Sequence, residues 1–142
     1  VVEGPSDRAA SFARSRLQSG PIEIAPMVDI VEEFAIHGHV ASDGAVRSGR
    51  AVRYTESARS GTALPGIAPA PPDVAAALQR ALGRVGEELV GLGYFGPLGI
   101  DAFTWRDAAG TVRLRAVSEV NARYTLYFGM CAPELVGLDH AD

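Results

Sequence analysis

The chain has 142 residues, of which 47% are hydrophobic and 21% are charged, the composition of an ordinary globular domain with one core. Its net charge of −4 argues against nucleic acid as a partner, and no apolar run approaches the roughly 20 residues that would cross a membrane. All thirteen basic residues are arginines, which excludes chemistry that needs a lysine.

The cellular location is predicted from the lack of a disulfide framework and of a signal-peptide pattern in the given sequence. The single cysteine, Cys131, provides no disulfide framework, and no basic segment followed by an apolar block marks a signal peptide. We therefore predict a cytoplasmic protein. The chain begins at Val1 rather than at methionine, so we expect it to belong to a longer protein with further domains. The sequence does not specify an oligomeric state.

The chain opens with a predicted helix. Ser6 is suited to cap a helix over Asp7–Leu17, which Gly20–Pro21 ends. Ile22–Ala25 predicts a short strand. Glu32–Ala41 then alternates between two faces, one with Phe34, Ile36 and Val40 and the other with Glu33, Ala35, His37 and His39.

A β-hairpin and a long loop follow. Asp43–Gly44 predicts a tight turn, and Ala45–Thr55 predicts the returning strand, with Val46, Val52 and Tyr54 in phase. Glu56–Pro71 is rich in Gly, Ala, Ser and Pro and predicts a loop of about sixteen residues, which is long for a compact domain. Both a loop over a site and a plain linker fit this composition.

The second half predicts one helix and a second hairpin. A helix opens at Pro71–Asp73 and runs to about Gly91, with an apolar face of Val74, Leu78, Ala81, Val85, Leu89 and Leu92. Leu98–Trp105 and Val112–Val120 predict strands joined at Asp107–Gly110, and Glu134–Leu138 predicts the start of another helix. Because hairpins outnumber crossovers, we predict an α+β fold whose largely antiparallel sheet has flanking helices.

Acidic residues stand in the strands of the second hairpin. The turn allows two registers; in one, Asp101 opposes Val117 and shares a face with Glu119 and Asn121, and in the other it does not. In the first register the side chains of Asp101 and Glu119 lie diagonally, roughly 7–8 Å apart. Two carboxylates on a partly buried face need a compensating positive charge.

Arg123 or a divalent cation can supply that charge. Asp101, Glu119 and Asn121 offer hard oxygen donors, which suit Mg²⁺ or Mn²⁺ rather than Zn²⁺. The alternative is that Asp101 is a solvent-exposed strand residue and that Glu-x-Asn occurs by chance.

Residues 93–125 carry a resemblance. "GYFGPLGIDAF" followed by "EVNARYT" resembles the C-terminal part of an ATP-grasp domain, where an acidic residue on one strand faces Glu-x-Asn on its hairpin partner. Arg123 extends this to Glu-x-Asn-x-Arg, as in biotin carboxylase-like members. Upstream, "IEIAPMVDIVEEF" resembles the hinge, which would put Ala25, Met27 and Val28 beside adenine and Glu33 on the ribose.

The resemblance implies a fold, cofactors and a reaction. The chain would be the C-terminal lobe of an ATP-grasp domain, with nucleotide-side strands in 1–55, a loop in 56–71, and the helix and metal-binding hairpin in 72–142. It would use ATP and Mg²⁺ or Mn²⁺ to phosphorylate a small-molecule carboxylate, and an amine would then displace phosphate. Arg123 would steady the phosphoryl group or the carboxylate.

Two departures from the family pattern leave the activity open. Glu3 stands where the family has a phosphate-binding lysine, and the glycine-rich loop that usually follows is missing. The chain is then either a working carboxylate–amine ligase, in which Arg8 or Arg14 replaces the lysine, or a degenerate module retained for binding or assembly. A plain α+β domain without a site is the third interpretation.

Several other residues are interpreted as structural. We expect His37 and His39 to lie on a solvated strand face, and Cys131 to be a small buried hydrophobe. We expect Tyr94 and Trp105 to pack in the core.

Overall fold

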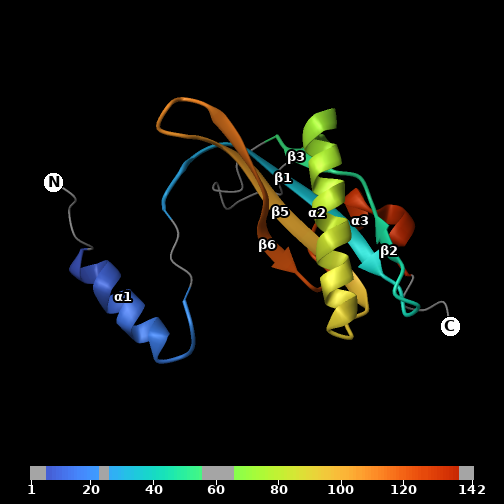
Figure 1. Cartoon of the computed structure of the whole chain (residues 1–142), viewed down its shortest axis with the longest axis horizontal. Coiled ribbons are helices and arrows are strands. Elements are labelled where there is room, and N and C mark those ends of the chain that lie inside the picture. Colours follow the sequence, from blue (N-terminus) through green and yellow to red (C-terminus); the bar gives the residue numbers. More distant parts are fainter. Residues whose placement is uncertain (1–5, 23–25, 56–65, 138–142) are drawn as a thin grey trace.

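The computed structural model describes residues 6–22, 26–55 and 66–137. These residues form a six-stranded sheet in the order β4-β3-β1-β5-β6, with β2 also paired to β1 (Figure 1). Every pairing is antiparallel, so the predicted α+β class is confirmed. The elements are α1 Asp7–Leu17, β1 Asp29–Val40, β2 Val46–Ser48, β3 Val52–Tyr54, β4 Ile67–Pro69, α2 Pro72–Gly91, β5 Gly96–Arg106, β6 Val112–Asn121, α3 Phe128–Cys131 and the 3₁₀ helix η2 Pro133–Leu135.

Helix α1 has the predicted bounds and stands apart from the sheet (Figure 1). The Ser6 hydroxyl accepts a hydrogen bond from the Ala9 amide at 3.3 Å, which satisfies one of the free N–H groups at the helix start. No residue of α1 is buried. The strand predicted over residues 22–25 is absent at Ile22, and its other residues lie outside the described part of the chain.

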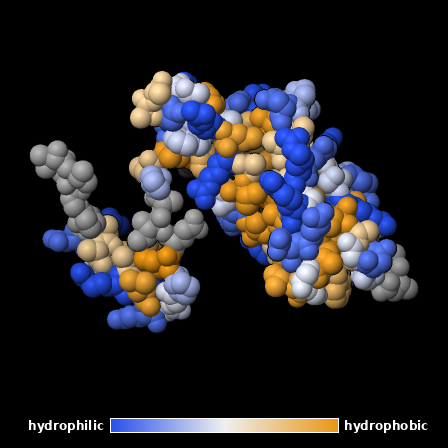
Figure 2. Space-filling view, viewed as in Figure 1, coloured by the Kyte–Doolittle hydropathy of each residue, from blue (hydrophilic) through white to orange (hydrophobic). Residues whose placement is uncertain are grey.

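Helix α2 covers one face of the sheet. Phe34 and Ile36 of β1 and Ile100 of β5 pack beneath Leu78, and each has a relative exposure of 1% or less. Figure 2 shows hydrophilic residues along the outer side of α2 and hydrophobic residues beside them, where the helix meets the sheet. The predicted helix is confirmed. Its apolar residues recur at the helical period, so they form one side of α2, which packs on the sheet as the core.

The apolar face of α2 differs from the predicted one at its C-terminal end. Leu92 is 83% exposed because the helix ends at Gly91, and Leu82 and Gly86 are buried instead. A Cβ on Gly86 would lie 2.6 Å from Cγ1 of Val46, so glycine allows the close approach of α2 to β2.

The predicted strand Ala45–Thr55 is two strands, β2 and β3, which pair with β1 in registers that differ by one residue. Val46 pairs with Val40, whereas Val52 pairs with Ala35, so the two valines face opposite sides of the sheet. The prediction that they are in phase is therefore wrong, because one extra residue between them reverses the alternation. As a result, β3 presents Tyr54 on the face away from α2.

The far face of the sheet is partly covered by α3 and η2. Cys131 packs on Ala35 and Val52, which confirms its predicted burial. Phe128 meets the His37 ring edge-on at 5.9 Å between centroids. His37 and His39 are 2% and 3% exposed, so their predicted solvation is wrong.

Three smaller differences concern loops and ends. Residues 67–69 of the predicted loop form β4 on β3, and residues 56–65 lie outside the described part. The helix predicted over Glu134–Leu138 is replaced by η2, which ends at Leu135; residue 138 is not described. Tyr94 packs on the core as predicted, whereas Trp105 is only half-buried. Among the described helices, none has both the length and the apolar character that crossing a membrane requires.

Candidate functional site

The pairing of β5 with β6 sets the geometry of the site. Near the turn, Phe103 pairs with Arg115; beyond a bulge, Asp101 pairs with Glu119 and Gly99 with Asn121. The predicted opposition of Asp101 and Val117 is wrong, because residues 116–118 of β6 bulge opposite Ala102. The bulge adds an even number of residues, so the two carboxylates and Asn121 still share a face, and Asp101 lies directly opposite Glu119 rather than diagonally.

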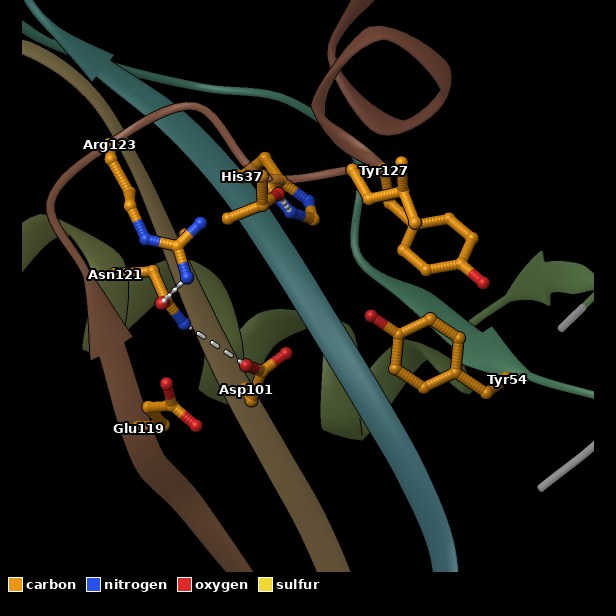
Figure 3. A pocket seen from close by; sticks show the side chains of 10 residues that line it. His37, Tyr54, Asp101, Glu119, Asn121, Arg123 and Tyr127 are labelled. Carbon is orange, nitrogen blue, oxygen red and sulfur yellow. Dashed lines mark hydrogen bonds between the residues drawn. The ribbon is translucent and has the colours of Figure 1, made fainter. Parts of the chain in front are cut away.

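A chain of hydrogen bonds links three of the predicted site residues (Figure 3). Nδ2 of Asn121 donates to Oδ2 of Asp101 at 3.3 Å. Nη2 of Arg123 donates to Oδ1 of Asn121 at 3.0 Å, and its Nη1 donates to the Tyr124 carbonyl at 3.3 Å. Asn121 therefore places the Arg123 guanidinium beside the carboxylates without a direct ion pair.

These side chains line a pocket of about 270 Å³. Its wall combines the acidic pair with one cation and several hydroxyl and aromatic groups: His37, Tyr54, Gly99, Asp101, Glu119, Asn121, Arg123, Thr125, Leu126 and Tyr127. A second pocket of about 270 Å³ shares Tyr54, Asp101 and Glu119 with the first and adds Glu33.

A third hollow of about 930 Å³ lies beside the second and shares Ile30, Phe103 and Ser118 with it. Met27, Val28 and Trp105 line this larger hollow. The three hollows together form what we call the groove, on the sheet face opposite α2. The groove therefore brings together four regions of the sequence that carry predicted site residues. Of the predicted nucleotide residues, only Ala25 lies outside the described part of the chain.

The acidic end of the groove is electrostatically strained. Burial raises the pKa of the Asp101 carboxyl above its usual value, and the negative charges of Glu119 and Glu33 raise it further, while Arg123 lowers it. The nearby Arg123 guanidinium therefore offsets only part of the rise in the Asp101 pKa.

Two pocket residues, His37 and Thr125, were not predicted to take part in the site. Nε2 of His37 and Oγ1 of Thr125 form a hydrogen bond of 2.6 Å, while Nδ1 of His37 is buried without a hydrogen-bond partner. Burial lowers the His37 pKa to about 4, so the ring is neutral near pH 7. This hydrogen bond joins the segment after Arg123 to β1. Thr125 follows Arg123 by two residues, so its closeness to the motif was the one sequence feature that could have indicated its place in the site.

The donor set fits Mg²⁺ or Mn²⁺ only in part. Within residues 6–22, 26–55 and 66–137, no group of three His, Cys, Asp or Glu side chains is placed to hold a metal ion. Two opposed carboxylates nevertheless suit Mg²⁺, which takes one or two carboxylates and completes its shell with water and phosphate oxygens. Asn121 turns its amide N–H₂ to Asp101, so its oxygen would join only after the amide rotates. Ligation by these residues stays a prediction.

No protein-family model and no curated protein matches the chain. Among solved structures, N5-carboxyaminoimidazole synthase from Aspergillus clavatus, in complex with ADP and 5-aminoimidazole ribonucleotide, is similar over 81% of this chain, with 16% identity and a TM-score of 0.43. The chain spans 29% of that enzyme's length.

Proposed function

We propose that this chain is the nucleotide- and Mg²⁺-binding part of an ATP-dependent ligase that activates a small carboxylic acid as an acyl phosphate. The observation that carries the proposal is the direct pairing of Asp101 with Glu119 at one end of a groove. The same groove is lined by Glu33 and, further along, by Met27.

The groove offers separate places for the parts of ATP. The large hollow, with Met27, Val28 and Trp105, is apolar enough to take the adenine ring. Glu33 lies between this hollow and the acidic pair, where a carboxylate can accept hydrogen bonds from ribose hydroxyls. The phosphates would then reach Asp101 and Glu119.

The acidic end supports the phosphoryl transfer. Asp101 and Glu119, joined by Asn121 after rotation of its amide, would hold Mg²⁺ or Mn²⁺. When bound, such a cation would offset the charge of the phosphates and of the carboxylates that hold it. Arg123 keeps further N–H donors for the acid's carboxylate or for the transferring phosphoryl group.

The proposed reaction has two steps. An oxygen of the acid attacks the γ-phosphorus of ATP and releases ADP, giving an acyl phosphate. An amine next attacks the acyl carbon, forms the C–N bond of an amide, and releases inorganic phosphate and a proton.

A second candidate is a non-catalytic module that keeps the fold for binding or assembly. The observation that favours it is the position of α1, which carries Arg8 and Arg14 and stands apart from the sheet (Figure 1). Of the described residues that line the pocket with the acidic pair, Arg123 is the only cation. Glu3 lies outside the described residues.

Calorimetric titration with ADP and with a non-hydrolysable ATP analogue, with and without Mg²⁺, tests the proposal. We expect binding that requires Mg²⁺, and a raised melting temperature, because a ligand selective for the folded state stabilises it by about 2.7 kcal/mol at 100 times its Kd. Absence of any binding at millimolar nucleotide would contradict the proposal. Acyl phosphate formation can be tested with a panel of acids, by trapping the product with hydroxylamine as a hydroxamate. If nucleotide binds but no acid gives a hydroxamate, the non-catalytic module is favoured.

A further inference from the structure

We propose that the hydroxyl group of Tyr54 donates a hydrogen bond to the terminal phosphoryl group of the bound nucleotide. The inference rests on the proposed function and adds to it a binding residue that lies in none of the recognised motifs. Tyr54 is the last residue of β3. Its side chain lies on the groove face of the sheet because the registers of β2 and β3 on β1 differ by one residue.

Tyr54 lies where the two smaller pockets of the groove meet. Its side chain lines both smaller pockets, which also share Asp101 and Glu119, so it stands at the boundary between the Glu33 side and the Arg123 side of the groove. In Figure 3 the hydroxyl end of Tyr54 points toward Asp101 from the opposite wall of the pocket. A cation held by the acidic pair would place its phosphate ligand in the space between them.

The Tyr54 hydroxyl is held in place by the packing of its ring and has no other role in the described part of the chain. Its ring packs on Tyr127 with centroids 5.2 Å apart and planes at 55°, and both rings pack on the cluster around Val52 and Cys131. The hydroxyl makes no hydrogen bond to any residue in the described part of the chain. A donor that is fixed before the ligand arrives needs little reorganisation to bind an anionic oxygen.

The protonation state agrees with a donor role. Burial raises the pKa of Tyr54 well above the ordinary value of a tyrosine, and the negative charge of Asp101 raises it further. The hydroxyl therefore keeps its proton near neutral pH. Because the chain contains no lysine, neutral donors are well suited to supplement Arg123 at the phosphates.

Tyr127 offers a matched control within the same ring pair. Its hydroxyl points away from Asp101 and Glu119 in Figure 3, although its ring contacts that of Tyr54. Replacing either tyrosine by phenylalanine keeps the ring and removes only the oxygen. The two substitutions thus differ in the direction of the hydroxyl that is lost.

The experiment is calorimetric titration of the full chain and of Tyr54→Phe and Tyr127→Phe with Mg²⁺-ADP and with the Mg²⁺ complex of the imido analogue of ATP. We expect Tyr54→Phe to lower the affinity for the triphosphate analogue by about tenfold, because one hydrogen bond to a charged group is lost. The affinity for ADP should fall by less than about twofold, because ADP lacks the terminal phosphoryl group. We expect Tyr127→Phe to weaken the binding of the two nucleotides equally and by less than about twofold, because Tyr127 lines the pocket but its hydroxyl is directed away from the acidic pair.

The outcomes separate the two proposals. If the unsubstituted chain binds both nucleotides and Tyr54→Phe weakens neither, or weakens both equally, the Tyr54 inference is wrong and the proposed function stands. An equal selective loss in Tyr127→Phe would also overturn the inference, since packing rather than the hydroxyl would be responsible. If the unsubstituted chain binds neither nucleotide, both proposals fail.

Discussion

Strands β1 and β5 contribute side chains to both faces of the sheet. One face is buried under α2, and the other carries the charged side chains of the groove. On the face under α2, Phe34, Ile36 and Ile100 are enclosed by apolar side chains. On the opposite face, Asp101 and Glu33 stay partly exposed along the groove, and only the part under α3 is closed. Because alternate residues of a strand point to opposite faces, one segment can carry both stability and binding. Substitutions on the two faces should therefore have separable effects.

The largest expected effect is on the α2 face. Leu78→Ala should lower the free energy of unfolding by about 2–5 kcal/mol, because it removes a fully buried side chain and leaves a cavity. Urea denaturation measures this change. The control is Glu33→Gln on the groove face, which should change stability by less than about 0.5 kcal/mol. Similar losses from both substitutions would break the distinction between the faces.

A smaller effect is expected where α3 closes the groove face. The folded-state pKa of His37, about 4, lies below its ordinary value of 6.5, so between these values the folded protein binds fewer protons than the unfolded chain. The contribution of neutral His37 is complete above pH 6.5 and is lost as the pH falls toward 4. We expect stability to drop by about 1–2 kcal/mol from pH 7 to pH 5.

Urea denaturation at both pH values, on the natural chain and on His37→Gln, measures this contribution. The substituted chain should lose less stability on acidification than the natural chain. An identical drop in both proteins would show that His37 does not titrate as its burial requires.

The smallest effect is expected at the open acidic end. Because the folded-state pKa of Asp101 is raised, stability falls as the pH rises from the ordinary pKa through the raised one. Asp101→Asn should therefore stabilise the ligand-free protein at pH 7, by less than about 1 kcal/mol since the carboxyl is partly solvated. The gain should vanish near pH 3. Thermal unfolding at both pH values checks this, and destabilisation at pH 7 would contradict it.

Much of the fold could be predicted because local signals agree with the tertiary structure. Ser6 caps α1, and Pro72 and Gly91 bound α2 as their residue types indicate. Both hairpin turns occur where Asp–Gly spacing placed them, at Gly44 and Gly110, which have positive φ.

The differences arise where contacts distant in sequence decide the outcome. His37 is buried by Phe128, which lies about ninety residues further along the chain, and no local pattern reveals that cover. The bulge that brings Glu119 opposite Asp101 depends on strand pairing, so only the shared face was predictable. Tyr54 was assigned to the wrong face because the irregularity near Gly49 reverses the alternation.

The central claim is that Asp101 and Glu119 form a cation site for the phosphates of a nucleotide. The most direct measurement is calorimetric titration of Mg²⁺-ADP into the natural chain, Glu119→Gln and Glu87→Gln, the last changing an exposed carboxylate on α2. We predict that Glu119→Gln abolishes Mg²⁺-dependent binding, whereas Glu87→Gln leaves it unchanged. Binding of equal strength in all three proteins would contradict the account.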